Sequence, residues 1–306
     1  MGQASCCRAI AVFALLLVGR PSPVHAADIR PATISQASGV DAKRQSDGVV
    51  RIGWSRTDVP VKVDGLPLPA AAGLGSWAAF KSTGDQAIVM GDTVVFEDEV
   101  DAAMDAAFAS GLEVTGLHNH FFYDTPKVFF MHIGGRGTPA GLAAGVKAVW
   151  DAIRAVRRAH PVPAAGFGGA IPVIGKLDAK ALEKAVGHPA DVNGNVVKIT
   201  IGREGRMHGE TIGASMGLTT WAAFTGSDTL AVVDGDVIMT AGEVQAVLHA
   251  LRKAGIHVVA LHNHMLDEQP GYYFVHFWGK GSAIGLAQGF RRMLDAQARQ
   301  HDQPAH

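Results

Sequence analysis

The sequence contains only two cysteines, Cys6 and Cys7, and both lie at its N-terminal end. From residue 8 onward there is therefore no thiol, no disulfide framework and no thiolate ligand for a metal ion. Any chemistry with a soft or borderline metal then depends on histidine, of which the chain has 14. The shortage of cysteine thus directs attention to the histidines.

Long apolar runs and an excess of basic charge are also lacking. After the N-terminal segment no stretch reaches the roughly 20 apolar residues that a membrane-spanning helix needs, so we expect no transmembrane segment. The 27 lysines and arginines are balanced by 28 aspartates and glutamates, which gives a net charge of −1. This balance argues against a broad nucleic-acid-binding surface, and we expect no nucleic-acid partner.

The first 26 residues have the pattern of a secretory signal peptide. Arg8 precedes an apolar run over residues 9–18, and Val24-His25-Ala26 provides a cleavage site with small residues. The run is too short to span a bilayer. Neither cysteine stands at the cleavage point, where a lipid anchor would need one. We therefore predict a signal peptide over residues 1–26 and a periplasmic or secreted mature protein.

The two halves of the chain repeat each other. Trp-Ala-Ala-Phe at 77–80 recurs at 221–224, and Leu-His-Asn-His at 117–120 recurs at 261–264, both with an offset of 144 residues (221 − 77). A segment rich in proline, glycine and alanine separates the halves. The sequence therefore predicts an internal duplication, with repeat 1 over 27–158, a linker over 159–175 and repeat 2 over 176–306.

Each repeat is expected to run strand, strand, helix, strand, strand, helix. In repeat 1 the strands are expected near residues 49–54, 86–96, 112–120 and 127–133, and the first helix near 97–110, before Gly111. Strands paired mainly as hairpins, with helices covering one face, make an α+β fold with mainly antiparallel sheets. We expect Trp77 and Trp221 in the core, and Glu99 and Glu243 in capping roles at the helix starts.

Three histidines with the same spacing occur once in each repeat. The pattern is His, one residue, His, eleven residues, His, and its members are His118, His120, His132, His262, His264 and His276. Side chains alternate faces along a strand, so His118 and His120 are expected to share a face with Val114 and Gly116. A symmetric hairpin then places His120 directly opposite His132, with Cβ atoms about 4.5–5.5 Å apart. The spacing predicts a three-histidine metal site in each repeat.

Three imidazoles match the ligand set of a catalytic zinc site, in which the fourth position is open to water. Water bound there ionises near neutral pH and can attack an ester-like carbonyl. Asp124 and Glu268 occupy equivalent positions in the two hairpin connections. Either carboxylate is a candidate catalytic base, fourth ligand or partner of a ligand. Zinc is the first choice, although imidazole also suits copper, nickel and iron.

A cation between two glycines follows the third histidine of each repeat, as Arg136 and as Lys280. Beside the N-terminus of the next helix, such a cation can hold a substrate carboxylate or phosphate. A tight turn that carries a solvated charge is the alternative interpretation. Both residues are candidate substrate-binding groups.

Several of these motifs resemble the LppY/LpqO family of exported bacterial proteins over nearly the whole mature chain. The resemblance rests on Trp-Ala-Ala-Phe at 77–80, Leu-His-Asn-His-Phe-Phe at 117–122, Met-His-Ile-Gly-Gly at 131–135, Met-His-Gly at 207–209 and Asp-Gly-Asp at 234–236. It implies an exported location and an architecture more than an activity. The histidine spacing alone is also similar to that of a zinc-dependent ester hydrolase family, which implies zinc ligation by both triads.

These observations predict an exported zinc-dependent hydrolase of a small ester-like or anionic substrate. The alternatives are a periplasmic protein that binds metal without turnover and a ligand-binding or envelope-interaction protein with metal-free histidines. The expected partners are a small-molecule substrate or a metal ion. The oligomeric state is left open by the sequence.

Overall fold

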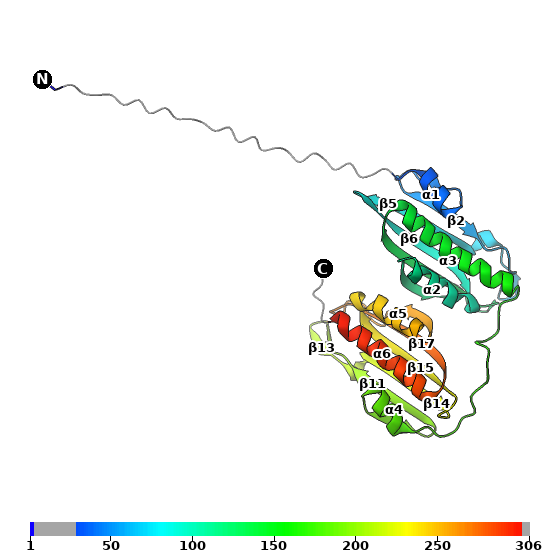
Figure 1. Ribbon diagram of the computed structural model, residues 1–306, viewed down its shortest axis with the longest axis vertical. Coiled ribbons are helices and arrows are strands. Elements are labelled where there is room, and N and C mark those ends of the chain that lie inside the picture. The colour runs from blue at the N-terminus through cyan, green and yellow to red at the C-terminus, as the bar shows by residue number, and fades with distance from the viewer. Residues whose placement is uncertain (3–28, 302–306) are drawn as a thin grey trace.

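The computed structural model describes residues 1–2 and 29–301. The predicted signal peptide, apart from its first two residues, lies outside this described part. The described residues form two similar halves that share one sheet of 12 strands (Figure 1). The predicted fold class is confirmed, because the chain is an α+β protein built from a tandem duplication with mainly antiparallel strands.

The first half has three α-helices and nine strands. Its elements are α1 (Pro31–Ser38), β1 (Lys43–Arg44), β2 (Val50–Ser55), β3 (Lys62–Val63), β4 (Leu66–Pro67), η1 (Ala70–Ala72), β5 (Gly75–Thr83), β6 (Gln86–Phe96), η2 (Glu97–Glu99), α2 (Val100–Ala109), β7 (Glu113–His118), β8 (Asp124–Thr125), β9 (Val128–Gly137) and α3 (Pro139–Ala159).

The second half repeats this order with small differences in its connections. Its elements are α4 (Ala179–Val186), β10 (Ala190–Asn193), β11 (Val196–Gly202), β12 (Gly205–Met207), β13 (Glu210–Ile212), η3 (Ala214–Met216), β14 (Thr219–Gly226), β15 (Ala231–Thr240), η4 (Ala241–Glu243), α5 (Val244–Lys253), β16 (His257–His262), β17 (Tyr272–Gly281) and α6 (Ala283–His301).

The large sheet joins the two halves edge to edge. Its strand order is β1-β2-β5-β6-β9-β7-β16-β17-β15-β14-β11-β10. The halves meet where β7 pairs antiparallel with β16, and a single residue pair, Leu117 with Leu261, forms this junction. Short strands outside the large sheet form two small sheets, β4-β3-β8 and β12-β13. The junction is therefore much narrower than the pairing within either half.

The helices of both halves lie on one face of the large sheet (Figure 1). One continuous apolar core, which includes Phe80, Trp150, Phe224 and Phe290, fills the space between the helices and the strands. Burial of this apolar surface is the main driving force for folding. We call the face that carries the helices the helix face and the other the open face.

Two smaller apolar clusters lie apart from this core. The first contains Val94, Phe96, Val128 and Phe130, and the second contains Ile238, Tyr272 and Phe274. Val94 and Phe96 alternate along β6 with Val95, which belongs to the main core, so the first cluster packs on the open face. In each repeat one phenylalanine of the cluster stacks against a histidine of the motif: Phe130 against His120 and Phe274 against His264.

The expected order of elements omitted one long strand per repeat, β5 and β14, as well as the first helix of each half, α1 and α4, and the short strands. Trp77 lies on β5 and Trp221 on β14, next to buried alanines whose side chains point into the core. The prediction that both tryptophans pack in the core is wrong. Each is half-buried on the open face, where Arg51 lies 4.4 Å from the Trp77 ring centroid and Lys198 Nζ lies 4.3 Å from that of Trp221. Successive side chains on a strand point to opposite faces, so the alanine points into the core and the neighbouring tryptophan points to the open face. The size and polarity of the two side chains do not predict this.

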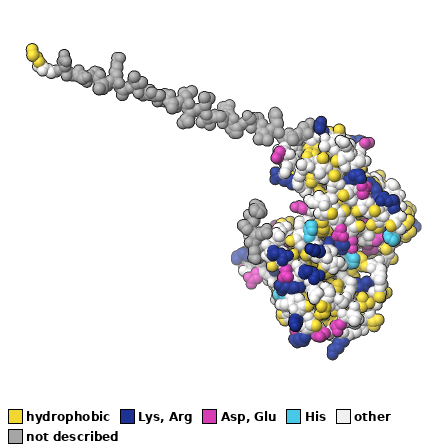
Figure 2. All heavy atoms as spheres, viewed as in Figure 1, with side chains coloured by type: hydrophobic (Ala, Val, Ile, Leu, Met, Phe, Trp, Pro, Cys, Tyr) yellow, Lys and Arg dark blue, Asp and Glu magenta, His cyan; other side chains and the backbone are white. Residues whose placement is uncertain are grey.

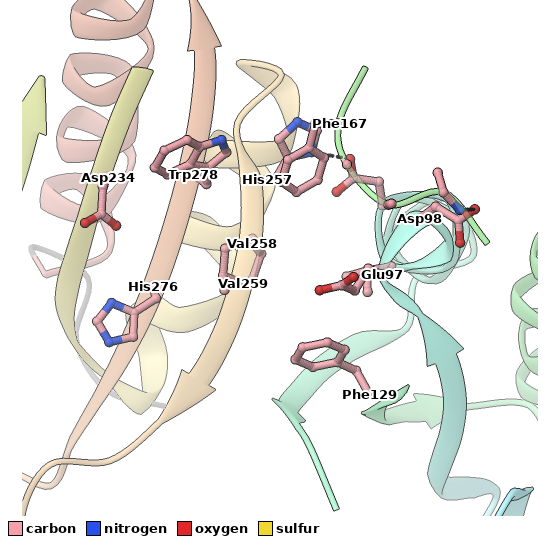
Figure 3. Close-up of a pocket in the computed structure, with 15 residues that line it drawn as sticks. Glu97, Asp98, Phe129, Phe167, Asp234, His257, Val258, Val259, His276 and Trp278 are labelled. Carbon is pink, nitrogen blue, oxygen red and sulfur yellow. Dashed lines mark hydrogen bonds and ion pairs between the residues drawn. The ribbon is translucent and has the colours of Figure 1, made fainter. Parts of the chain in front are cut away.

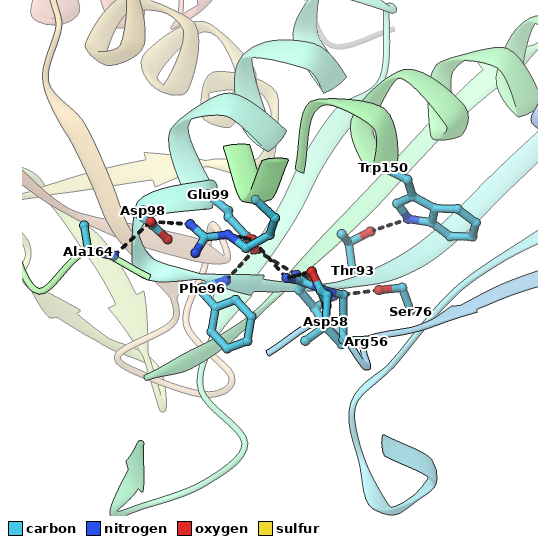
Figure 4. Close-up of polar contacts among 11 residues, drawn as sticks. Arg56, Asp58, Ser76, Thr93, Phe96, Asp98, Glu99, Trp150 and Ala164 are labelled. Atoms are coloured by element: carbon cyan, nitrogen blue, oxygen red, sulfur yellow. Dashed lines mark hydrogen bonds and ion pairs between the residues drawn. The ribbon is translucent and has the colours of Figure 1, made fainter. Parts of the chain in front are cut away.

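A buried ion pair fixes the start of α2 (Figure 4). Arg56 and Glu99 side chains are both 0% exposed, and Arg56 Nη1 lies 2.8 Å from Glu99 Oε2. Glu99 also accepts a hydrogen bond from the backbone N–H of Phe96, which confirms its predicted capping role. Arg157 of α3 forms a second ion pair with Glu99 at 2.6 Å. The carboxylate thus ties a loop, a strand end and two helices together.

The equivalent carboxylate of the second half, Glu243, leads to a prediction about pH. Burial raises the pKa of Glu243, but hydrogen bonds from Arg203, the Thr240 N–H and Gln297 outweigh burial and hold the pKa below its usual value of 4.5. A carboxyl whose pKa is lower in the folded state adds stability above its unfolded pKa and loses it as the pH falls. Glu243→Gln is therefore expected to reduce stability by about 1–3 kcal/mol at neutral pH.

This deficit should shrink as the pH falls below the unfolded pKa of 4.5. Urea denaturation of wild type and variant between neutral and acidic pH measures it. A deficit that stayed constant over the whole range would contradict the assigned role of the carboxylate charge.

Close packing of β14, β15 and β17 explains Gly235. A Cβ atom built on Gly235 would overlap the ring of Phe277 and the carbonyl oxygen of Trp221. Gly235→Ala is therefore expected to destabilise the protein by about 1–3 kcal/mol, because the ring or the strand must shift. Gly242→Ala is the matched control, since nothing lies within 4 Å of its built Cβ. Equal thermal stability of the two variants would contradict this account.

On the face shown in Figure 2, basic and acidic side chains of the described residues are interspersed. Within the same part of the chain, no helix is both long enough and apolar enough to cross a membrane.

Candidate metal centre

Three neighbouring strands bring one aspartate and two histidines of each repeat together on the open face. In the first repeat, Asp92 of β6 pairs with His132 of β9, which in turn pairs with Gly116 of β7. His118 ends β7 two residues later. The row therefore runs across the sheet from Asp92 to His132, with His118 as the diagonal neighbour of His132.

The second repeat has the same row. Asp236 of β15 pairs with His276 of β17, and His276 pairs with Ala260 of β16. His262 ends β16, as His118 ends β7. Both repeats thus build the same arrangement from equivalent residues.

The predicted register of the histidine hairpin is wrong in two respects. His120 does not lie opposite His132 but follows the end of β7, and Val114 belongs to the core on the helix face. A β-bulge between Val114 and Gly116 causes the second difference, because the extra residue reverses the alternation of faces. The loop between β7 and β9 is also centred earlier than Pro126 and contains the short strand β8. The histidines still converge, because His120 folds back over Phe130 as a stacked ring.

The donor atoms of the second repeat lie at distances suited to one metal ion. One ligand atom from each of Asp236, His262, His264 and His276 can be chosen so that all four lie within 4.8 Å of one another. His264 Nε2 is 3.3 Å from Asp236 Oδ2. A tetrahedral zinc site with bonds of about 2.0–2.1 Å has ligand atoms about 3.3 Å apart. These side chains form a cluster that could hold a metal ion.

The first repeat places two imidazole nitrogens even closer together. His118 Nε2 lies 2.9 Å from His132 Nε2, and the His118 ring also stacks against His120 at 5.1 Å between centroids. His118 Nδ1 lies 3.2 Å from the carbonyl oxygen of Asn119, which can accept a hydrogen bond only if Nδ1 is protonated. In a neutral His118, Nε2 is then a lone pair aimed at His132. That lone pair can accept a hydrogen bond from Nε2–H of His132 or bind a cation.

Backbone carbonyls orient the histidines of the second repeat in the same way. His276 Nδ1 lies 3.3 Å from the carbonyl oxygen of Gly235, so Nε2 is left for a metal. A hydrogen bond from the other ring nitrogen commonly fixes the tautomer and direction of a ligating histidine. Asn263 does not face the cluster, because its Nδ2 donates to the carbonyl of Met265 and braces the loop.

Two aspartates that the sequence analysis did not select complete the clusters. Asp92 and Asp236 are 8% and 2% exposed, and Oδ1 of each is buried without a hydrogen-bond partner among the described residues. A buried carboxylate oxygen without a partner is costly, and a bound cation would remove that cost. Gly-Asp at 91–92 and at 235–236 is a repeated dipeptide in the sequence. The sequence does not show that this dipeptide lies on the strand next to the histidines.

The environment keeps several of these histidines neutral. Burial lowers the pKa of His262 and of His264, and this effect outweighs the nearby Asp236, which raises both values. Burial likewise lowers the pKa of His120 in the first repeat. Neutral imidazole is the form that binds a metal. At neutral pH these three rings therefore have the protonation state that metal binding requires.

Asp124 and Glu268, the predicted catalytic bases, bind the backbone instead. Asp124 Oδ2 accepts a hydrogen bond from Val128 N–H, and Glu268 Oε1 accepts one from Tyr272 N–H, both at 2.7 Å. Asp124 also forms an ion pair with Lys127 at 3.0 Å. Both carboxylates are buried and hold the start of the strand that carries the third histidine. Glu268 is not one of the four residues of the second repeat that could hold an ion together.

Arg136 and Lys280, the predicted substrate-binding cations, lie near the ends of β9 and β17. Arg136 is exposed, and the described part of the chain places it four residues beyond His132. Lys280 donates a hydrogen bond to the carbonyl of Gly168 in the linker. In these positions the two cations are separated from the histidine clusters.

A cavity of about 480 Å³ opens beside the first cluster and reaches the second. Its walls include His118 and His132 from the first repeat and His262 and Tyr273 from the second. Gly116 also lines it, and a Cβ atom there would lie 3.2 Å from Cδ2 of His132. The glycine therefore leaves room for the His132 ring. A small molecule in this cavity would contact both repeats.

Residues 32–152 and 180–296 each match the model of a family described as Domain of Unknown Function (DUF1259). The two matches together cover most of the chain, which therefore belongs to this family. They also agree with the two halves seen in the fold. A comparison with curated proteins found no match.

Three solved structures are similar over much of their length. They are EtuB from Clostridium kluyveri (11% identity, 84% of this chain and 90% of that chain, TM-score 0.23), the trimeric bacterial microcompartment shell protein PduB (11%, 84% and 91%, TM-score 0.19) and the double-ringed trimeric shell protein MSM0271 from the RMM microcompartment (13%, 70% and 82%, TM-score 0.18). Scores this low carry no argument about function.

Proposed function

We propose that each repeat binds one divalent transition-metal ion through three histidines and one aspartate, and that zinc is the best-matched ion. The observation that carries this proposal is the group formed by Asp236, His262, His264 and His276 around one point. Neutral imidazoles with one carboxylate are borderline donors, which suit zinc and also copper, nickel or iron. The first repeat offers the equivalent set, Asp92 with its own three histidines.

Binding is proposed as the primary role because four protein donors can fill a tetrahedral zinc shell. Asp236 is 3% exposed at its side chain and lies beneath the cluster, whereas His264 is 35% exposed. Asp236 would hold the ion on the side of the sheet, and solvent would reach the ion on the side of His264. We propose that this binding takes place outside the cytoplasm, in accord with the N-terminal pattern and the LppY/LpqO resemblance.

Hydrolysis of a small ester-like or anionic substrate is the second candidate. The cavity lined by His118, His132 and His262 favours it, because a substrate there would lie beside a bound ion. A bound zinc ion supplies polarisation of a carbonyl and a water of lowered pKa. Tyr273 lines the same cavity, and its hydroxyl can donate a hydrogen bond to the substrate.

Elemental analysis of the purified mature protein tests the binding proposal. One equivalent of metal per repeat is expected, and Asp236→Asn should weaken one site by about 10–100-fold while leaving the other unchanged. Glu268→Gln is the control, because Glu268 holds the backbone of Tyr272 and no ion. Protein that takes up no zinc in a competition assay would refute the proposal.

An ester-hydrolysis screen with and without chelator tests the second candidate separately. Turnover that chelator abolishes and zinc restores is the expected result for an enzyme. Full metal occupancy without such turnover would remove the hydrolase candidate and leave the binding function in place.

A further inference from the structure

A second and larger cavity, of about 620 Å³, lies between the two repeats (Figure 3). It exists because β7 and β16 pair only through Leu117 and Leu261, so the first half of β16 has no neighbour from β7. The cavity is bounded by β15, β17 and β16 on one side and by the start of α2 on the other. Linker residues 164–167 form a third wall.

The linker wall is held in place by two contacts. The backbone N–H of Ala164 donates to Asp98 Oδ2 at 3.0 Å, and the Phe167 ring stacks on His257 with centroids 3.8 Å apart. Phe129 and Trp278 add two further aromatic rings to the lining. The cavity is thus a built feature with fixed apolar walls.

The charged groups in this lining are all acidic. They are Glu97, Asp98, Asp101 and Asp234, and no lysine or arginine is among the described residues that line the cavity. Asp98 is paired with Arg157, and Asp101 with Arg252 at 2.7 Å. In the described part of the chain, Glu97 and Asp234 form no ion pair within 4 Å. Two carboxylates are therefore available to a ligand.

These two carboxylates stand at separate ends of the cavity. Asp234 pairs with Trp278, and Trp278 pairs with His257, so Asp234 lies two strands, or about 10 Å, from the backbone of β16. Glu97 lies on the opposite side of β16, beyond Val258 and Val259 (Figure 3). A ligand that reaches both must be elongated, positive at each end and apolar between.

Comparison of the repeats shows that the fold does not need this acidity. At the offset of 144 residues, the four acidic residues correspond to Ala241, Gly242, Gln245 and Met90, none of which is charged. Gln245 instead bridges the edge of β7, where its amide accepts from Val114 N–H and donates to Val114 C=O. At the equivalent position of the second half, the neutral Gln245 thus hydrogen-bonds to the backbone of β7, so the acidic residues are a feature of one side of the interface alone.

We propose that this cavity binds a linear aliphatic diamine or polyamine, with one ammonium group at Asp234 and another at Glu97. The alkyl chain would lie across β16 along Val259, whose side chain is exposed, whereas Val258 packs in the core. Phe129 and Trp278 present ring faces that attract cations and cover methylene groups. A volume of about 620 Å³ lies in the range of small-molecule sites. The proposal does not depend on metal at the histidine clusters.

Titration calorimetry with three probes of equal chain length tests this proposal on the mature protein. The probes are diaminoheptane, aminoheptane and heptanediol, used with chelator present and at about 0.15 M salt, which screens non-specific attraction. Diaminoheptane is expected to bind at least about tenfold more tightly than aminoheptane. Heptanediol should bind most weakly. Because metal is absent, failure here leaves the metal proposal untouched.

Single substitutions locate the site. Glu97→Gln and Asp234→Asn should each reduce the affinity for diaminoheptane to that for aminoheptane. Asp267→Asn is the control, since Asp267 is an exposed carboxylate in the other cavity. Equal binding of all three probes, absence of saturable binding, or an equal loss in the Asp267 variant would overturn the proposal.

Discussion

Replacing His262, His264 and His276 together by alanine is expected to remove one equivalent of bound metal and to leave the other. The reason is geometric, because these three rings and Asp236 surround one point and belong to one repeat. Loss of an ion present at 1,000 times its dissociation constant also removes about 4 kcal/mol of stabilisation. Metal stoichiometry and thermal unfolding with and without chelator measure the two effects.

The matched variant replaces His118, His120 and His132, and it should remove the other equivalent. His160→Ala is the control for a general loss of histidine, because His160 is exposed at the end of α3. Unchanged stoichiometry in either triple variant would mean that the corresponding histidines bind no ion. Chelator is expected to lower the unfolding temperature of wild type by more than that of either triple variant, because each variant keeps one ion.

The second large effect is expected at the buried ion pair. Glu99→Gln should destabilise the protein by about 3–5 kcal/mol, because buried Arg56 then keeps only the partly exposed Asp58 as a counter-charge. Arg56 and Glu99 are both 0% exposed, so water cannot replace the lost partner. Arg157 loses a carboxylate at the same time. Equilibrium denaturation in urea measures the change.

An exposed pair provides the comparison. Lys147 and Asp151 form an ion pair one helical turn apart, with side chains 46% and 45% exposed. Asp151→Asn is expected to cost less than about 1 kcal/mol, since solvent screens such pairs. Similar losses for Glu99→Gln and Asp151→Asn would show that burial does not set the strength of the Glu99 contacts.

Much of the fold could be predicted from patterns within the sequence. The offset between Trp77 and Trp221 predicted the duplication, and the apolar spacing before Gly111 predicted the first helix, which ends at Ala109. The strand that carries His132 was predicted near residues 127–133 and spans Val128–Gly137. Such signals are local, because each depends on residues within one element. β5 was missed, since Trp-Ala-Ala-Phe has small residues where a strand pattern usually has branched ones.

The details of the site depend on contacts between distant strands. One bulge residue between Val114 and Gly116 changed which side chains share a face, and no sequence pattern marks it. Asp92 joins the cluster only because β6 pairs with β9 in one register. Asp124 seemed better placed along the chain, yet it holds the backbone of Val128. The histidine spacing indicated a site, while the fourth donor required the tertiary structure.

The junction between β7 and β16 has a consequence for the origin of the chain. Leu117 and Leu261 are equivalent residues, and each is the other's partner. A residue that pairs antiparallel with its own counterpart lies on a two-fold axis, which is the geometry of an isologous dimer. The protein is in this sense a homodimer made covalent by its linker. A covalent link between two similar halves allows one half to carry acidic residues at this interface that the other half lacks, which two identical subunits cannot do.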